Sequence, residues 1–360
     1  MIVLWRNESI WMPVYIMNDS SFQSGPYLWL LISELFLYLL TLLIIVRTVR
    51  IFLTVQRVHK NMNTMMAVFL FQWLEAIIGK LIITPFQIGL LRVSDSAQPY
   101  VSWWTEDVGE MIRVADEKTV VPLQIASFLV WHYAYSMIFG ILNLGVERIF
   151  ASVLIKDYEN KPRRFIPTAL LLLTNLVTLP FSYLVLANKT GFYIGTSPCF
   201  TNSFLVFAMF LVVWKVNECR RKRTFHPARN SDYSLPQQYQ LNENCRVLML
   251  AKNLLIVVLC AMSVPCALLI LLVLGWAPSF KMLFIHVMEN SIYLNPIIIC
   301  SVLMLSDPHW RDEYLNIVPG IKKLDSMRVF VTRPESERAR VSVAEAEGIQ
   351  YFQQLREAWA

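Results

Sequence analysis

The stretch Tyr27–Val46 reads "YLWLLISELFLYLLTLLIIV" and is the clearest indication of the fold in this chain. It is almost wholly apolar, and twenty helical residues at about 1.5 Å per residue cover the roughly 30 Å hydrocarbon core of a bilayer. A helix is the expected form, because lipid offers no hydrogen-bond partner to an open backbone N–H or C=O group. The stretch therefore predicts a membrane-spanning helix.

Six further apolar stretches of similar length follow it, separated by short polar segments. They cover residues 65–90, 120–146, 165–186, 198–216, 247–274 and 282–305. The 360 residues are 56% hydrophobic and 16% charged, whereas soluble domains carry about 25% charged residues. The alternative, a soluble protein with buried core helices, does not explain seven such stretches in succession. The sequence predicts an all-α membrane protein, a seven-transmembrane helix bundle.

The basic residues predict the orientation of this bundle. With the amino terminus outside, 25 of the 32 Lys and Arg residues lie in the inner loops, at adjoining span ends or in the tail, and six lie outside. Residues 1–26 are then an extracellular amino terminus, and residues 306–360 are a cytoplasmic tail with the carboxyl terminus inside. Asn7, Asn18 and Asn188 each begin an N-x-S/T glycosylation sequon, and all three fall on the predicted outer side.

Glu147 and Arg148 adjoin the inner end of the third span. One interpretation is an anchor pair at the membrane interface, where charges reach water at low cost. The other is a polar lock, in which Arg148 pairs with an acid in one state and turns toward a partner protein in another. Two prolines, Pro265 and the Pro296 of an Asn295-Pro296 pair, predict kinks in the sixth and seventh spans.

Several polar and aromatic residues inside the spans are candidates for ligand binding, because polar groups in a bilayer are costly and so are often functional. We expect them to line a central cavity open to the outside, although contacts between helices explain them equally well. The candidates are Glu75, Trp131, His132, Tyr135, His286 and Glu289. Glu75 and Lys80 are five residues apart on one helix, so each should face a different neighbouring helix.

Two quoted segments carry a resemblance to a known family. Val146–Pro167, "VERIFASVLIKDYENKPRRFIP", resembles the signature after the third helix of nematode serpentine chemoreceptors of class epsilon, the Sre family. Glu289–Cys300, "ENSIYLNPIIIC", followed by "SDPHWRDEY", is similar to the end of that family's seventh helix. Span order and length extend the likeness over nearly the whole chain.

The resemblance implies a chemosensory G-protein-coupled receptor that binds a small-molecule ligand and signals through a heterotrimeric G protein. It places Glu147 and Arg148 at the acidic-Arg motif of the third helix, and Asn295 and Pro296 at the NP motif of the seventh. The implied location is the plasma membrane, as a multi-pass protein, with the sensory cilium as one place within it. The ligand, the G-protein class and the formation of a receptor dimer stay open.

Other functional classes fit the sequence less well. A seven-helix ligand-gated chemosensory ion channel is the main alternative, and the charge distribution opposes the inverted layout of such channels. A transporter should show internal repeats and glycine-rich broken helices, but the chain has 11 glycines and no repeat. It lacks the usual hydrolase and metalloprotease motifs and a metal-ligand spacing of its six cysteines, so we expect no enzyme, cofactor or metal site. The basic residues flank apolar spans, which favours a lipid bilayer and not nucleic acid as the partner.

Overall fold

The computed structural model describes residues 1–315 except residues 24, 56–59, 94–98, 103, 115, 154–164, 225–234, 275 and 277–279. Met1–Arg311 form one unit; of the second unit, residues 312–360, only the end of a short helix is described. The predicted tail therefore lies outside the described residues from residue 316 onward.

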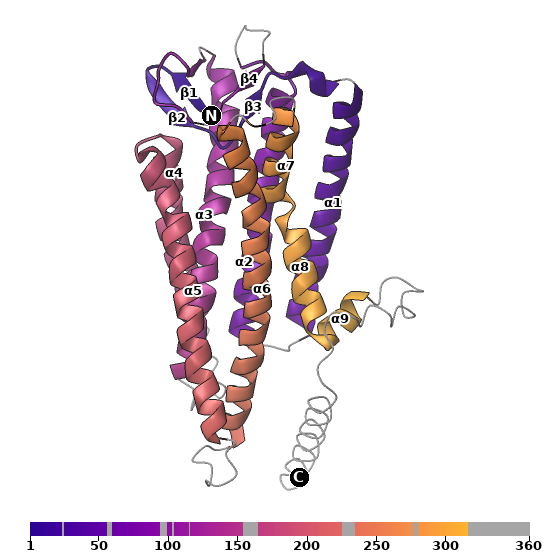
Figure 1. Ribbon diagram of the computed structural model, residues 1–360, viewed down its shortest axis with the longest axis vertical. Coiled ribbons are helices and arrows are strands. Elements are labelled where there is room, and N and C mark those ends of the chain that lie inside the picture. Colours follow the sequence, from indigo (N-terminus) through magenta and orange to yellow (C-terminus); the bar gives the residue numbers. More distant parts are fainter. Residues whose placement is uncertain are drawn as a thin grey trace. The chain divides into compact units, whose positions relative to one another are not determined.

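The described part of the chain is mainly helical, with short strands before α1 and between α2 and α3 (Figure 1). The helices are α1 Gly25–Thr54, α2 Lys60–Gln87, α3 Glu117–Val153, α4 Phe165–Leu186, α5 Gly191–Thr224, α6 Leu235–Val273, α7 Lys281–Tyr293, α8 Asn295–Ser306, α9 Pro308–Leu315 and the 3-10 helix η1 Ser20–Gln23. The strands are β1 Ile2–Trp5, β2 Glu8–Trp11, β3 Ile16–Met17, β4 Tyr100–Val101 and β5 Ile112–Arg113.

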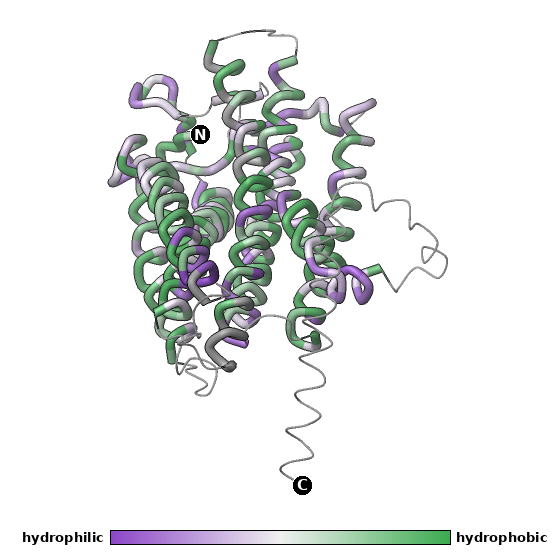
Figure 2. Tube along the Cα trace, turned by 60° about the horizontal axis from the view of Figure 1, so that its bottom comes forward, coloured by the Kyte–Doolittle hydropathy of each residue, from purple (hydrophilic) through white to green (hydrophobic). Residues whose placement is uncertain are grey.

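Helices α1 to α6 are each long and apolar enough to cross a membrane, and α7 with α8 makes a seventh span if the bent pair is counted as one. Large apolar side chains such as Trp29, Phe36 and Leu176 point outward from the bundle, and hydrophobic residues cover most of the helices (Figure 2). An apolar exterior on this scale suits lipid as the solvent. The predicted seven-helix bundle is confirmed. The helices extend beyond the apolar spans, because helix formation continues into polar residues, as at the Arg-rich end of α5.

The seventh span breaks at the Asn295-Pro296 pair, where α7 and α8 meet at an angle of 44°. Pro296 has no N–H to donate, and the N–H of Ile297 bonds to the carbonyl of Leu294 at 3.1 Å, not to that of Tyr293. The carbonyl of Tyr293 instead accepts the indole N–H of Trp73 from α2 at 2.7 Å. A neighbouring helix thus satisfies the backbone group that the break releases. By contrast, α6 continues through Pro265 as a single helix.

The helix after the seventh span is held by an aspartate cap and a buried tryptophan. Oδ1 of Asp307 accepts the backbone N–H groups of His309 and Trp310 at 3.0 and 3.3 Å, which satisfies donors left free at a helix start. The indole N–H of Trp310 donates to the carbonyl of Val55 at the end of α1. This anchors the start of α9 against α1.

Small strands lie at the end of the bundle where α1 begins, which we call the strand end (Figure 1). β1 pairs antiparallel with β2 through a two-residue turn, in which Arg6 and Asn7 both have positive φ, as type I′ hairpins require. β1 also pairs with β5, and β3 pairs with β4. These pairings join the amino-terminal segment to the α2–α3 loop by backbone hydrogen bonds. The inward side chains of this segment are buried, among them Met12, Val14 and Met17. These strands were not predicted from the sequence.

Helices α2 and α3 pack closely because glycines face their neighbours. A Cβ at Gly79 would lie 2.7 Å from the carbonyl oxygen of Ala126 and 2.8 Å from a methyl group of Val130. A Cβ at Gly140 would lie 2.8 Å from the ring of Phe69. Small residues commonly allow such close approach between membrane helices.

This packing predicts opposite outcomes for two Gly→Ala substitutions inside helices. Gly79→Ala should lower the free energy of unfolding by about 1–3 kcal/mol, since the new methyl group meets backbone that cannot move aside. Gly145→Ala is the matched control: its Cβ would meet only the flexible tip of Met209, and alanine favours a helix by about 1 kcal/mol. Thermal unfolding of the purified protein in one detergent would measure both. Equal stability of the two variants would contradict the close approach.

Candidate functional site

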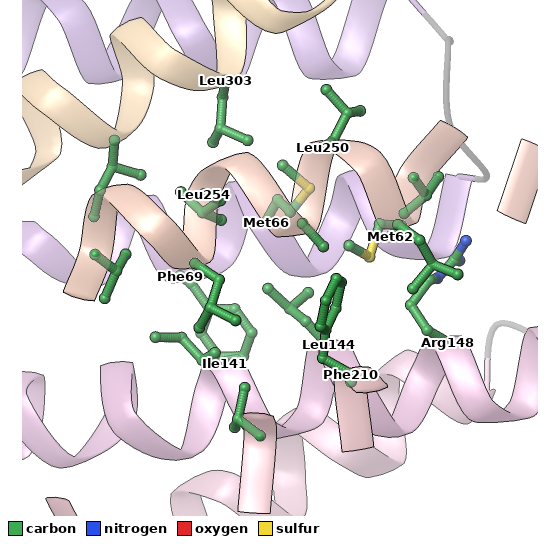
Figure 3. Close-up of a pocket in the computed structure, with 18 of the residues that line it drawn as sticks. Met62, Met66, Phe69, Ile141, Leu144, Arg148, Phe210, Leu250, Leu254 and Leu303 are labelled. Atoms are coloured by element: carbon green, nitrogen blue, oxygen red, sulfur yellow. The ribbon is translucent and has the colours of Figure 1, made fainter. Parts of the chain in front are cut away.

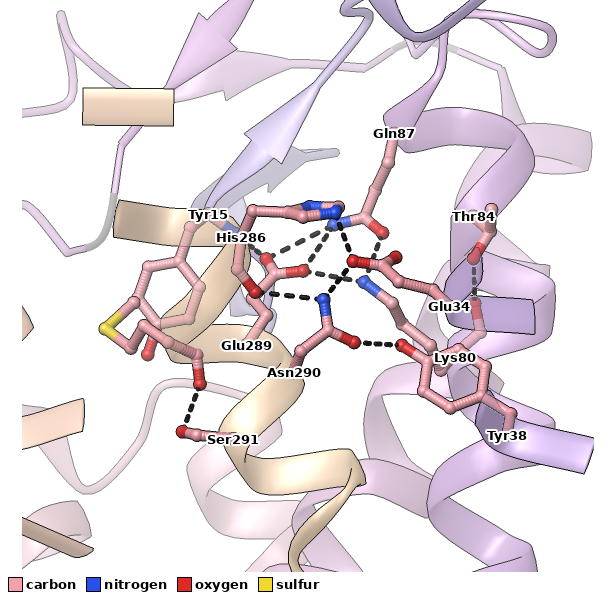
Figure 4. A network of polar contacts seen from close by, with 11 residues as sticks. Tyr15, Glu34, Tyr38, Lys80, Thr84, Gln87, His286, Glu289, Asn290 and Ser291 are labelled. Carbon is pink, nitrogen blue, oxygen red and sulfur yellow. Dashed lines mark hydrogen bonds and ion pairs between the residues drawn. The ribbon is translucent and has the colours of Figure 1, made fainter. Parts of the chain in front are cut away.

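A cluster of buried polar side chains lies between α1, α2 and α7 near the strand end (Figure 4). We call it the strand-end polar cluster. Its members are Glu34 from α1, Lys80 and Gln87 from α2, and His286, Glu289 and Asn290 from α7. Each of these six side chains is at least nine-tenths shielded from solvent.

An ion pair between Lys80 and Glu289 forms one half of the cluster. Nζ of Lys80 lies 2.7 Å from Oε2 of Glu289, and both side chains are 6% exposed. Nε2 of Gln87 donates to both carboxylate oxygens of Glu289, at 3.0 and 3.2 Å. Oε1 of Gln87 accepts a hydrogen bond from Nζ of Lys80 at 2.7 Å. The backbone N–H of Tyr15 adds a fourth contact to Glu289 at 3.3 Å. A buried ion pair needs such additional hydrogen bonds to offset its loss of water.

The other half of the cluster is centred on Glu34. The imidazole of His286 contacts its carboxylate, and Nδ2 of Asn290 donates to the same oxygen. Oδ1 of Asn290 accepts the hydroxyl of Tyr38 at 2.6 Å. The cluster thus holds two carboxylates against one ammonium group and one imidazole. With His286 protonated, the formal charge of the whole cluster would be zero.

The amino-terminal segment covers this cluster. Phe22 packs on the ring of His286 with 5.4 Å between centroids, and Ile16 and Phe22 close a residual cavity of about 20 Å³ beside Glu34 and Lys80. Burial, and secondly the charge of Glu289, raise the pKa of Tyr15 to about 12. The segment therefore seals the polar cluster from the strand end.

Glu75 and His132 form a second, separate polar contact. Oε2 of Glu75 on α2 lies 2.5 Å from Nδ1 of His132 on α3. The other ring nitrogen lies 3.3 Å from the hydroxyl of Ser136, which lies 3.3 Å from that of Thr178 on α4. Glu75 and Lys80 thus contact α3 and α7 respectively, as their spacing predicts.

Trp131 and Tyr135 lie in a third place, against the strands and α5. The indole of Trp131 donates to the carbonyl of Trp11 at 2.9 Å, and the hydroxyl of Tyr135 donates to the carbonyl of Gly195 at 2.7 Å. These two side chains are four residues apart on one face of α3, whereas His132 is rotated about 100° from Trp131. The six ligand candidates therefore make their contacts at three separate positions, and the expectation of a shared cavity open to the outside stays a prediction.

Glu147 and Arg148 lie at the opposite end of α3 and bind each other. Nε of Arg148 donates to Oε2 of Glu147 at 2.5 Å, and Nη2 donates to Oε1 at 2.7 Å. The two residues are 0% and 4% exposed, so this fork of charged groups is buried. Nearby, α5 is tied to α3: Asn217 and Arg220 donate to the hydroxyl and the carbonyl of Ser152. We call this the Arg148 end of the bundle.

Asn295, at the break of the seventh span, faces α3. Its Oδ1 accepts the hydroxyl of Tyr133 at 3.4 Å. The break is one turn beyond Glu289 and Asn290, so the strand-end polar cluster and the hinge belong to one element. Pro265, in α6, has no role in either group of contacts among the described residues.

The three sequons differ in their surroundings. Asn7 is exposed at the tip of the β1–β2 turn. Asn18 is 4% exposed, and its Oδ1 accepts the N–H of Val93 at 3.1 Å. Asn188 donates its amide to the hydroxyl of Ser9 at 3.1 Å. Among these three residues, Asn7 is exposed, Asn188 is half-buried and Asn18 is buried.

Sequence reasoning missed Glu34, Gln87 and Asn290 as members of the polar cluster. A signal for Glu34 was present, because an acid within an otherwise apolar span is a candidate for a buried contact. Asn290 lies four residues after His286 and so shares its helix face. Gln87 carried no comparable signal, since uncharged amides are common at helix ends.

Comparison with known proteins agrees with this architecture. A family model described as "Sre G protein-coupled chemoreceptor" matches residues 1–360. The chain is 59% identical to serpentine receptor class epsilon-38 of Caenorhabditis elegans over 98% of both chains. It is 33% identical to serpentine receptor class epsilon-37 of the same organism over the full length of both, and 30% identical to class epsilon-33 over 98% of this chain and 97% of the relative.

These matches span the whole bundle, and the helices are apolar enough for a multi-pass membrane protein. The family is one of receptors and not of enzymes. This chain belongs to the Sre family of G protein-coupled chemoreceptors.

Proposed function

We propose that this receptor binds a small-molecule cue near the strand end and signals through a heterotrimeric G protein at the Arg148 end. The observation that carries the proposal is the buried, two-hydrogen-bond pair of Glu147 and Arg148 at the end of α3. Such a pair is stable while closed, yet Arg148 can exchange its carboxylate for another partner if the helices separate. Two arrangements of similar free energy are what a molecular switch requires.

The proposed orientation places the strand end outside the cell and the Arg148 end in the cytosol, with the receptor in the plasma membrane. The excess of Lys and Arg in the loops on the Arg148 side supports it. The exposed position of Asn7 supports it further, because a glycan can be added there without unfolding the strands.

The proposed cue acts on the polar groups near the strand end. A ligand with charged or hydrogen-bonding groups would compete with internal partners in the strand-end polar cluster, or at the Glu75–His132 contact beside it. Trp131 and Tyr135 of α3 belong to an aromatic cluster beside the strands, together with Trp11 and Phe192. Because Glu289 and Asn290 precede the hinge at Leu294 by about one turn, a change in their partners would bear on the hinge.

The direct experiment is expression of the full chain in cells with a promiscuous G protein, followed by a screen of volatile and water-soluble compounds. A compound-specific second-messenger response that requires the G protein is expected. A compound-gated current that persists without any G protein would instead establish the ion-channel alternative.

Substitutions at Glu147 and Arg148 should have different effects on the closed pair and on the state in which Arg148 binds another partner. Glu147→Gln removes the internal partner of Arg148 and should raise ligand-independent signalling several-fold, because loss of a partner from a buried pair costs the closed state about 3–5 kcal/mol. Arg148→Ala should abolish the ligand response at equal surface expression. Arg50→Ala, at an exposed arginine near the same end of α1, is the matched control. Basal signalling of Glu147→Gln equal to that of the unchanged receptor would refute the switch.

Substitutions at the Lys80–Glu289 pair should distinguish ligand recognition from stability. Glu289→Gln leaves the ammonium group of Lys80 without its carboxylate and should reduce both surface expression and response. The double variant Lys80→Met with Glu289→Met removes both charges and should restore expression, since apolar replacement of a buried pair is often tolerated. Its response to a charged cue should stay lost.

His132→Ala tests the neighbouring contact in the same assay and should alter the dose-response curve at normal expression.

Full expression and an unchanged response in the Lys80→Met, Glu289→Met double variant would show that the Lys80–Glu289 pair has a structural role alone.

Glycosylation mapping tests the orientation. Asn7→Gln should remove the glycosidase-sensitive shift in apparent mass, because Asn7 is the exposed sequon. Asn18→Gln and Asn188→Gln should leave the shift unchanged, since these amides are engaged or buried within the fold. A receptor without any glycan on Asn7, produced in secretory-competent cells, would contradict an outer strand end.

A further inference from the structure

A cavity of about 160 Å³ lies in the half of the bundle that carries Arg148 (Figure 3). Helices α2, α3, α5, α6 and α8 all contribute to its wall. Met66, Phe69 and Leu254 converge on it, and the side chain of Arg148 lies at one end. Of the six proposed ligand residues near the strand end, none lines this cavity in the described part of the chain.

The wall of the cavity is almost entirely apolar and partly shielded. Met62, Phe69 and Val213 are 7%, 5% and 6% exposed, whereas Met209 and Leu254 are half-buried, so the space lies between the helices and is open on one side. Among the described lining residues the only charged group is the guanidinium of Arg148, which is already bound to Glu147. A water molecule needs two to four polar partners to be held in a cavity, and this wall does not offer them.

The size and chemistry of the space indicate its occupant. A cavity of about 150 Å³ lined by Leu, Ile and Phe stays dry and binds benzene or xenon. Four methionines, Met62, Met66, Met137 and Met209, line the present cavity, and their unbranched, polarisable side chains adapt to different shapes. We propose that this cavity is a second ligand site, which takes a compact, uncharged apolar molecule about the size of a single aromatic ring.

Occupancy would bear on the arrangement of the helices. The bound molecule would touch α3 beside Arg148 and α6 across from it, and these contacts exist only while the helices stay packed as they are. A ligand shifts a conformational equilibrium toward the state that it binds better. Under the proposed function, an apolar molecule here would therefore favour the closed Glu147–Arg148 pair. The binding itself does not depend on that function.

Methionine methyl NMR tests the binding directly, with toluene as the probe. The full chain, labelled with ¹³C at its methionine methyl groups and assigned by single Met→Leu replacements, would be titrated in lipid nanodiscs. Saturable ring-current shifts are expected at Met62, Met66 and Met209. Met249, which is 39% exposed on α6, should show only the linear drift of toluene dissolved in lipid, and Met288, buried near the strand end, should not move.

Two tryptophan substitutions on α6 supply the matched pair. Leu254→Trp fills the cavity and should weaken toluene binding at least about ten-fold, equivalent to about 1.4 kcal/mol. Ile256→Trp adds the same bulk at a position that is 52% exposed and should leave the titration unchanged. If Leu254→Trp does not fold, Leu250→Phe fills the same space with less added volume.

Three outcomes would overturn the proposal: shifts without saturation at all methionines, unchanged binding in the filled variant, or equal binding of pyrene. Pyrene is too large for a space of this volume, so its binding would indicate a wider groove that extends into the lipid. Because the measurement reports binding and not signalling, its failure would leave the proposed G-protein coupling untouched.

Discussion

A charged side chain inside an apolar bundle must find its partners within the bundle, and the structure depends on this constraint throughout. Lipid cannot solvate a carboxylate or an ammonium group, so a charge that pairs with a residue of another helix fixes the position of that helix. Lys80 fixes α2 against α7 through Glu289, Glu34 fixes α1 against the same helix, and Glu75 fixes α2 against α3. The packing of small residues brings the helices close, and the charges select their register.

The backbone obeys the same constraint at the break in the seventh span. The carbonyl of Tyr293 loses its helical partner, and the indole of Trp73 replaces it. Tyr133 of α3 reaches Asn295 on the other side of the break. The hinge is therefore held by two side chains from two neighbouring helices. The strand-end polar cluster includes residues of α7, and the hinge joins α7 to α8. These two helices therefore connect the two ends of the bundle.

The sequence was sufficient to predict the bundle, because seven long apolar stretches have few other solutions in a lipid solvent. Proline also predicted the break at Asn295-Pro296, but the same signal did not mark a break at Pro265, through which α6 continues as one helix. The sequence could not predict which neighbours Trp131 and His132 face, because rotation about a helix axis is decided by packing and not by composition. The β1–β5 pairing joins segments over a hundred residues apart, and each strand is too short to carry its own signal. The buried contact of Glu34 could have been predicted, because an acid within an apolar span needs a partner. The apolar residues around it led to the prediction of a span alone.

The strands that close the amino-terminal end have a consequence for timing. A molecule dissolved in water cannot reach Glu289 by collision alone, because the backbone of Tyr15 already touches that carboxylate and Phe22 lies over His286. A ligand that binds Glu289, as proposed above, would require the β1–β5 and β3–β4 pairings to loosen first, which would slow its association well below the diffusional limit. The same step would delay its departure. A receptor built in this way would average over brief fluctuations in concentration and report a sustained exposure.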